Sequence, residues 1–278
     1  MNLDQYSTFG VTVADRVAEV VFDNPPVNVI SAVMMRELAD LMKILDDDGR
    51  VRVVVFSSEN PEFFLAHVDM HILDEADVLR ELTDKAAPKG LNAFQALGEL
   101  LRTHRLVSIV KLAGKARGGG AEFVAAADMA FAARETAGIG QIESLMGIVP
   151  SGGGMQYLLE RVGRNRALEV ILTGDLFDAD TAAAYGWINR SVPAAELDGF
   201  VDRVASVIAQ LPDGVAEAAK SVLSPKDLST GYAREETEWS ALIAGPCALP
   251  LMNAALARGA QTLEGERNLE TLLRSLNV

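Results

Sequence analysis

Two glutamates and a run of glycines form the part of the sequence whose residue types can do chemistry. Glu122 stands two residues after the triple glycine Gly118-Gly119-Gly120, and Glu143 follows shortly before a second glycine turn. Two carboxyl groups in different surroundings can hold different protonation states, so that one accepts a proton while the other donates one. Such a pair can add water across a double bond. Taken singly, however, a triple glycine is usually a flexible turn, and a glutamate at a helix start is usually solvated.

The triple glycine is predicted to join a strand to a helix. An apolar run, 106–112, leads into it, and a helix rich in small residues, 121–127, follows. The first N–H groups of a helix have no acceptor inside the helix, and the helix dipole favours negative charge there. Because glycine has no Cβ, a ligand can lie against this backbone. If a thioester carbonyl lies there, an N–H such as that of Gly119 can stabilise an enolate, and losing one such donor typically raises the barrier by about 3–4 kcal/mol.

The order of the elements indicates a single pocket shared by Glu122 and Glu143. The chain runs from a strand through the glycines and Glu122 into a helix, and then through a strand to Glu143 and the second glycine turn, 148–154. We therefore expect the two carboxyl groups to reach one substrate from different sides.

The elements expected upstream are those of a mixed α/β chain. Alternating residues predict a hairpin over 9–22, Ser31 is a good N-cap for a helix that ends at Gly49, and an apolar run predicts a buried strand over 51–56. A loop over 57–66 precedes a weakly amphipathic helix over 68–82. A second helix over 91–102 contains Gly98, which weakens helices.

The downstream part of the chain becomes helical after Pro193. We expect an α/β region over 1–193 and a helical region over 194–278 that packs on it or on a neighbouring subunit. In the helical region, the prolines at 246 and 250 are expected to interrupt a long helix that starts near residue 233.

The composition excludes several classes of protein. With 278 residues and a net charge of −14, the chain lacks the basic surface that nucleic acids require. Its single cysteine, Cys247, cannot form an intrachain disulfide. His67, Asp69 and His71 alternate, but no further Cys or His lies nearby in the sequence, so no metal site is predicted. The N-terminus does not have the pattern of a secretory signal, and no apolar run approaches the roughly 20 residues that span a bilayer. A cytoplasmic protein without a membrane partner is expected.

Four segments together resemble the crotonase superfamily, the enoyl-CoA hydratase and isomerase family. GKARGGGAEFVAAAD and GIGQIESLMGIVPSGGGMQYL are similar to the family's two glycine-rich segments, each with its glutamate. DNPPVNVIS and FLAHVDM are similar to two shorter segments upstream. The resemblance extends from about residue 9 to 193 and weakens in the tail.

The resemblance implies a fold, a substrate and a set of site residues. The implied fold is a spiral of ββα units with two roughly perpendicular sheets and a helical C-terminal region that supports trimers or dimers of trimers. The implied substrate is an acyl-CoA thioester, and no cofactor is implied. Glu122 and Glu143 fall on the acid/base positions, which together orient the water, and the Glu143 position protonates the α-carbon. The N–H groups of Val68 and Gly119 fall on the oxyanion hole. The residues expected to contact substrate around these positions are Ala66, His67, Arg117, Gly118 and Ser151.

Four positions depart from the family pattern. His67 replaces a glycine and is either a spectator or, because histidine titrates near neutral pH, a participant in chemistry. Glu62 stands where many relatives carry a cation for the CoA phosphates, and a carboxylate there would repel them. Arg117 replaces an apolar residue and is either a surface residue or a ligand for a substrate anion. Ser151 replaces a glycine and is either a turn residue or a hydroxyl near the water.

The sequence thus predicts an enoyl-CoA hydratase, a lyase of a class typical of fatty acid metabolism. One alternative is another reaction of the same superfamily, namely double-bond isomerisation, thioester hydrolysis or decarboxylation, and it is motivated by His67, Arg117 and Ser151. The other is a non-catalytic, oligomeric member of the superfamily, motivated by Glu62 and the altered tail.

Overall fold

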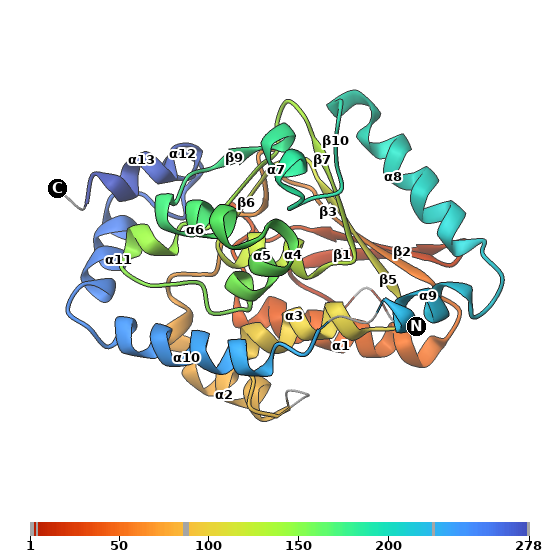
Figure 1. The fold of residues 1–278 in the computed structure, drawn as a ribbon, viewed down its shortest axis with the longest axis horizontal. Helices are drawn as coiled ribbons and strands as arrows, with labels where there is room; N and C mark the ends of the chain where they lie inside the picture. Colours follow the sequence, from red (N-terminus) through yellow and green to blue (C-terminus); the bar gives the residue numbers. More distant parts are fainter. Residues whose placement is uncertain (1–2, 4, 86–88, 224–225, 277–278) are drawn as a thin grey trace.

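The chain winds as a spiral in which each turn adds one strand to each of two sheets (Figure 1). The structure is a computed structural model that describes residues 3, 5–85, 89–223 and 226–276. In three successive turns a strand of the larger sheet is followed by a short strand of the smaller sheet and then by helix. This arrangement confirms the predicted α/β spiral of ββα units.

The larger sheet has six strands in the order β1-β2-β3-β5-β7-β10. The first two strands form the predicted antiparallel hairpin, and the other neighbours pair in parallel. Its strands are β1 Phe9–Ala14, β2 Val17–Phe22, β3 Val53–Ser58, β5 Val107–Leu112, β7 Met129–Ala133 and β10 Arg190–Val192.

The smaller sheet has four strands in the order β4-β6-β8-β9. They are β4 Phe63–Leu65, β6 Lys115–Arg117, β8 Gly138–Gly140 and β9 Phe177–Asp178. The predicted loop over 57–66 thus contains a strand. Its three residues, all buried, are too few to show a strand period.

Among the described residues, nine helical segments follow the strands of the spiral, and six more form the C-terminal region. Those of the spiral are α1 Ala32–Asp48, the 3₁₀ turn η1 Ile72–Glu75, α2 Ala76–Lys85, α3 Ala93–Thr103, α4 Gly119–Ala126, the 3₁₀ turn η2 Glu143–Met146, α5 Gly154–Val162, α6 Arg164–Thr173 and α7 Ala179–Tyr185. Those of the C-terminal region are α8 Ala194–Ala209, α9 Val215–Val222, α10 Ser229–Ile243, α11 Ala248–Ala257, α12 Leu263–Arg267 and α13 Leu269–Arg274.

Local signals account for the ends of these helices. The Ser31 hydroxyl caps α1 by accepting the N–H of Met34 over 3.2 Å, and Gly49 ends the helix at φ 70°. Gly98 of α3 cannot be replaced by a residue with a side chain, because a Cβ there would lie 2.2 Å from the hydroxyl oxygen of Tyr157. The glycine that weakens this helix is required for its packing.

Two sequence predictions were wrong in detail. The helix expected over 68–82 begins only at residue 72, because Val68 forms a β-bridge with Ile30. Pro250 does not interrupt a helix. It lies in the first turn of α11, where a missing N–H costs no hydrogen bond.

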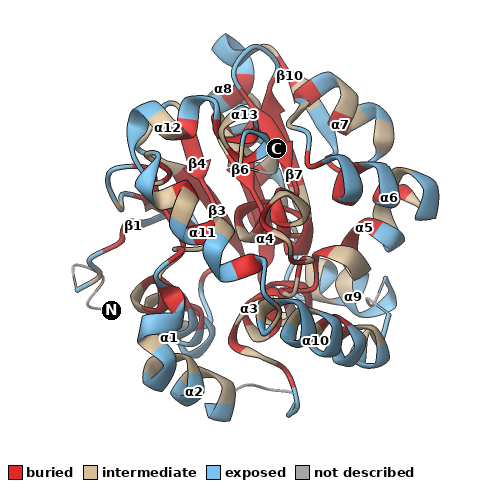
Figure 2. Cartoon of the chain, turned by 90° about the vertical axis from the view of Figure 1, so that its left-hand side faces the viewer, coloured by how far each residue is buried: buried red, intermediate tan, exposed pale blue. Residues whose placement is uncertain are grey.

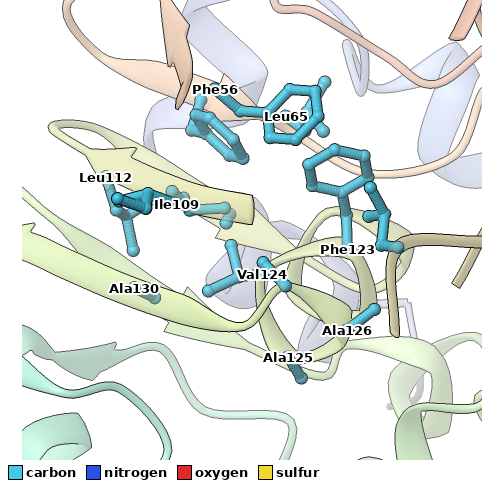
Figure 3. Packing of buried hydrophobic residues seen from close by; sticks show 14 of the residues in the cluster. Phe56, Leu65, Ile109, Leu112, Phe123, Val124, Ala125, Ala126 and Ala130 are labelled. Carbon is cyan, nitrogen blue, oxygen red and sulfur yellow. The ribbon is translucent and has the colours of Figure 1, made fainter. Parts of the chain in front are cut away.

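The small-residue helix α4 lies in the centre of the molecule. Its residues from Gly120 to Ala126 are all buried (Figure 2). Phe123 of α4 packs edge-on against Phe56 of β3, with ring centroids 5.0 Å apart, while Val124 faces the strand that carries Ile109 (Figure 3). This packing fixes the start of α4, and with it the glycine turn and Glu122.

The C-terminal region packs on the spiral of its own chain. Leu197 and Val201 of α8 belong to the main hydrophobic core. Met252 of α11 belongs to a second cluster together with Ile142 and Met146 beside η2. The C-terminal helices therefore cover the segment that carries Glu143.

In the described part of the chain, no single helix has the length and apolar character needed to cross a membrane, and only the pair α10 and α11, bent by 72°, meets the requirement jointly.

Candidate active site

A cavity of about 400 Å³ lies beside the glycine turn. Its walls come from the segment after β4, α2, the start of α3, the glycine turn, η2 and the C-terminal helices α10 and α11. Most of the lining is apolar, with Trp239, Met146 and Met252 among the larger side chains. Glu122 and Glu143 both line it, as predicted from their order in the chain.

Glu122 is held by the second glycine turn. Its Oε1 accepts the N–H of Gly152 over 2.8 Å and that of Gly154 over 2.9 Å. A Cβ on Gly152 would lie 2.5 Å from Oε2 of Glu122, and one on Gly154 would lie 2.7 Å from Oε1, so both positions require glycine. Burial raises the pKa of Glu122 to about 7, although the two N–H bonds act in the opposite direction.

Glu143 begins η2 on the other side of the triple glycine. A Cβ on Gly118 would lie 3.0 Å from its Oε1. The amide of Gln141, in the orientation that satisfies both its polar atoms, donates to Oε2 and Oε1 of Glu143 over 2.9 and 3.0 Å. Burial, followed by the charge of Glu122, holds the pKa of Glu143 well above its usual range.

A third buried carboxyl group comes from α10. Glu235 accepts the N–H of Gly153 over 2.9 Å and that of Gln156 over 3.1 Å. Burial and the nearby Glu122 raise the pKa of Glu235 to about 8. We call Glu122, Glu143 and Glu235 the carboxyl cluster. No Lys or Arg of the described segments forms an ion pair with any of them.

No local pattern in the sequence indicates a role for Glu235. It belongs to an acidic helix with no periodic apolar face, and only the fold brings α10 against the start of α5. The neighbouring Glu236 and Trp239, which line the cavity, were missed for the same reason. Oε2 of Glu236 accepts the side-chain N–H of Asn92 over 2.7 Å.

Val68 and Gly119 lie against each other beside Glu122. A Cβ on Gly119 would lie 2.5 Å from Cγ2 of Val68 and 3.8 Å from Oε2 of Glu122. The bridge with Ile30 uses the carbonyl of His67 and the N–H of Asp69, so the N–H of Val68 is directed away from Ile30. Gly119 is the first residue of α4, where an N–H has no acceptor inside the helix. Val68 and Gly119 thus lie side by side in the wall of the cavity.

Two of the expected substrate contacts are not supported by the structure. Arg117 is fully buried and does not line the cavity. Its guanidinium binds Glu270, with Nε 2.5 Å from Oε1, and Glu266, with Nη1 3.4 Å from Oε2. Ala66 is also fully buried outside the cavity lining, where its backbone pairs with Asn28 and Arg117. Arg117 is thus neither a surface residue nor placed to bind a substrate anion.

The remaining expected contacts, His67, Gly118 and Ser151, do line the cavity. The ring of His67 is only 3% exposed and bonds to Glu266. The carbonyl of Ser151 accepts the amide N–H of Asn92 over 3.0 Å, which holds the glycine turn to the start of α3.

Glu62 is neutralised by a neighbouring cation. Arg267 donates to both of its carboxylate oxygens, over 2.7 and 2.8 Å. This bond, helped by the charge of Lys115, lowers the pKa of Glu62. Arg267 and Lys115 together offset the negative charge of Glu62 at this corner. The repulsion expected between Glu62 and the CoA phosphates is therefore offset by a residue from the tail.

Within the described residues, no three His, Cys, Asp or Glu side chains are arranged to hold a metal ion. His71 bonds to Asp69 at the surface, whereas His67 is directed inward to Glu266. The alternating pattern thus places its two histidines on different partners.

The fold and the site agree with the family to which the chain belongs. The family model for enoyl-CoA hydratase/isomerase matches residues 12–240, so the chain is a member of that family of enzymes. A crystal structure of a candidate enoyl-CoA hydratase from Streptomyces avermitilis is 62% identical, with a TM-score of 0.96 over 98% of this chain and 99% of that one.

Curated relatives are more distant. A probable enoyl-CoA hydratase of Mycobacterium leprae is 31% identical over 81% of this chain and 84% of the relative. A carnitinyl-CoA dehydratase of Proteus mirabilis is 30% identical over 80% of this chain and 83% of the relative. These likenesses confirm the crotonase fold that the sequence motifs predicted.

Proposed function

We propose that the protein is an enoyl-CoA hydratase that adds water to a 2-enoyl-CoA thioester. The observation that carries the proposal is the pair Glu122 and Glu143, two buried carboxyl groups with raised pKa values on either side of the triple glycine. Near neutral pH such a pair holds one ionised and one protonated member, which is the state that hydration requires. Isomerases of the family usually keep only one of these two residues, so the presence of both favours hydration.

The proposed reaction begins with water bound between the two carboxyl groups. Ionised Glu122 takes a proton from the water while the oxygen bonds to the β-carbon of the substrate. The electron pair of the double bond moves toward the thioester oxygen, and the N–H groups of Val68 and Gly119 stabilise the resulting enolate. Protonated Glu143 then donates its proton to the α-carbon. In total, one O–H bond of water breaks, and one C–O bond and one C–H bond form. Glu122 is then protonated and Glu143 ionised, and proton exchange with solvent restores their initial states.

The cavity supports an apolar acyl group as the reacting chain. Beyond the glutamates, its lining is dominated by Met146, Met252 and Trp239 and by aliphatic side chains of the segment after β4. Burial of such a chain contributes about 0.8 kcal/mol for each CH₂ removed from water. The balance of charges around Glu62 supports binding of the CoA phosphates at the outer corner.

Assembly, location and pathway are further parts of the proposal. We infer a homotrimer or a dimer of trimers in the cytoplasm, acting in fatty acid metabolism, from the resemblance to the family. Exposed apolar residues such as Leu172, Leu159 and Val207 are compatible with contacts between subunits.

The test is an assay of hydration with crotonyl-CoA and with longer 2-enoyl-CoA thioesters. The loss of the enoyl absorbance measures the rate, and mass spectrometry identifies the product. Wild-type protein is expected to form the 3-hydroxyacyl product. Glu143→Gln, which keeps the shape but removes the acid, is expected to lose at least about 100-fold in kcat. Glu59→Gln, an exposed carboxylate outside the site, is the matched control and is expected to match the wild type. Full activity in Glu143→Gln would overturn the assignment of roles.

A further inference from the structure

The ring of His67 has an acceptor at each nitrogen. Nδ1 lies 2.7 Å from the carbonyl oxygen of Val68, and Nε2 lies 2.9 Å from Oε1 of Glu266. A carbonyl oxygen can only accept, so Nδ1 must carry a hydrogen. If Glu266 is ionised, Nε2 must carry one as well. A ring with both hydrogens is an imidazolium.

The surroundings of Glu266 favour its ionised form. Its Oε1 also accepts the backbone N–H of Gln261 over 2.8 Å, and its Oε2 faces the guanidinium of Arg117. The charge of His67 and the hydrogen bonds from it and Gln261 lower the pKa of Glu266 despite burial, and Glu266 in turn raises the pKa of His67. Glu266 therefore accepts at both oxygens.

The charges of the nearest groups balance when His67 is protonated and Glu266 is ionised. His67, Arg117, Glu266 and Glu270 form one buried group, which we call the ionic cluster. With a charged ring it contains two cations and two anions. With a neutral ring beside an ionised Glu266 it contains one cation and two anions, which is costly in a buried site. The next cation, Lys115, also acts on Glu266 and Glu270 but is partly exposed.

The ionic cluster joins the two walls of the oxyanion hole. His67 directly precedes Val68, and Arg117 directly precedes Gly118 and Gly119. Both side chains converge on Glu266, which comes from α12 at the far end of the chain. The two N–H donors of the proposed hole are therefore held at a set spacing by one carboxylate.

Gln261, in the turn before α12, binds the segment that follows Val68. The side-chain oxygen of Gln261 accepts the N–H of Met70 over 2.9 Å, and its amide nitrogen donates to Asp69 over 3.0 Å. Gln261 adopts φ 66°, a conformation that costs energy outside glycine, so these bonds are formed at the expense of local strain. The turn that contains Gln261 is thus bonded to both Asp69 and Met70.

We propose that His67 is a buried imidazolium that positions the oxyanion hole and places a positive charge beside the enolate. It acts through the peptide of Val68, whose carbonyl it binds, and through Glu266, which links it to the Arg117 wall. Its effect on rate rests on the proposed function, whereas its charge state does not. The glycine that the family carries at this position could supply neither the bond nor the charge.

The charge state can be read directly by ¹⁵N NMR on protein labelled at histidine. The chain has three histidines, so the spectrum is simple, and His67→Gln assigns the signal. We expect both nitrogens of His67 to remain protonated at pH 8, which is above the ordinary pKa of a histidine, about 6.5. A single N–H on His67 at pH 7 would overturn the proposal.

A double-mutant cycle tests the charge balance without any assay of activity. His67→Gln leaves an extra anion in the ionic cluster and Glu266→Gln an extra cation, whereas the double variant restores neutrality. Each single variant is expected to raise the equilibrium constant for unfolding at least about tenfold. Independent effects multiply, so the reference for the double variant is the product of the two single factors. We expect the double variant to raise the constant by a factor at least about tenfold smaller than this product. If the ring is neutral, Nε2 accepts from a protonated Glu266, neither single variant leaves an unpaired charge, and the coupling falls below about tenfold, the range of a neutral hydrogen bond; that result would overturn the proposal.

Kinetics separate positioning from a purely structural role. His67→Gln is expected to lower kcat by about 10- to 100-fold, the loss typical of a displaced reactive geometry, while KM changes less than about threefold. His71→Gln removes a nearby exposed histidine and is expected to leave both constants unchanged. A kcat within twofold of wild type would overturn the role of His67. If wild-type protein hydrates no enoyl-CoA, the proposed function fails and the kinetic role with it, but the NMR signal and the cycle still decide the charge.

Discussion

The molecule buries two groups of glutamates within a few residues of the same glycine turn, and they behave in opposite ways. In the carboxyl cluster, burial raises the pKa of Glu122 to about 7 and holds that of Glu143 well above its usual range. In the ionic cluster, Glu266 is just as deeply buried, yet its pKa is lowered. The residue type and the burial are shared, so the difference comes from the partners.

The partners explain the contrast in physical terms. Desolvation favours the neutral form of every buried carboxyl group. Glu266 overcomes it because His67 and Arg117 supply positive charge, whereas Glu122 receives only backbone N–H bonds from the glycine turn. Compensated carboxylates hold structure, and uncompensated ones are left with protons that can be exchanged with a substrate.

The largest effect expected from this comparison is on the stability of the ionic cluster. Glu266→Gln removes the shared partner of His67 and Arg117 and is expected to lower the free energy of unfolding by about 3 kcal/mol. Urea denaturation at pH 7 measures it. Glu143→Gln is the matched change in the carboxyl cluster and is expected not to destabilise the protein. Equal losses in the two variants would remove the distinction between the clusters.

A smaller effect is expected on the pH dependence of stability. The pKa of Glu143 is well above its unfolded value near 4.3, so the folded state holds a proton that the unfolded chain releases as the pH rises. Stability is therefore lost as the pH rises through this interval. Glu143→Gln lacks the penalty and is expected to gain about 1–3 kcal/mol relative to wild type between pH 5 and pH 9. Denaturation curves at the two pH values measure the gain, and a pH-independent difference would contradict the raised pKa.

The parts of the molecule that could be predicted from the sequence are those that depend on contacts between residues close together in the chain. The glycines over 118–120 and 152–154 have fixed spacings, because a Cβ at any of them would lie 2.0–3.0 Å from a carboxyl group, a backbone oxygen or a packed side chain. The hairpin, the cap at Ser31 and the buried strands follow from short-range patterns in the same way. The identity of the two glutamates as a pair was accessible because both lie in one continuous stretch.

The other wall of the site was not accessible, because it depends on contacts between distant segments. Arg117 meets Glu270 across 153 residues, and His67 meets Glu266 across 199. Nothing in the local sequence around Arg117 distinguishes a buried ion pair from a surface residue. The same holds for Glu62, whose neutralising partner, Arg267, comes from the last part of the chain.

The most direct test of the account is a measurement of the protonation states of Glu143 and Glu266 at the same pH. Infrared difference spectra at pH 6 between wild type and each glutamine variant report whether the lost side chain was a carboxylic acid or a carboxylate. We expect the difference for Glu143→Gln to contain the band of a protonated carboxyl group and the difference for Glu266→Gln to contain only carboxylate bands. A carboxylate signal for Glu143 together with a protonated signal for Glu266 would contradict the assignment of one cluster to chemistry and the other to structure.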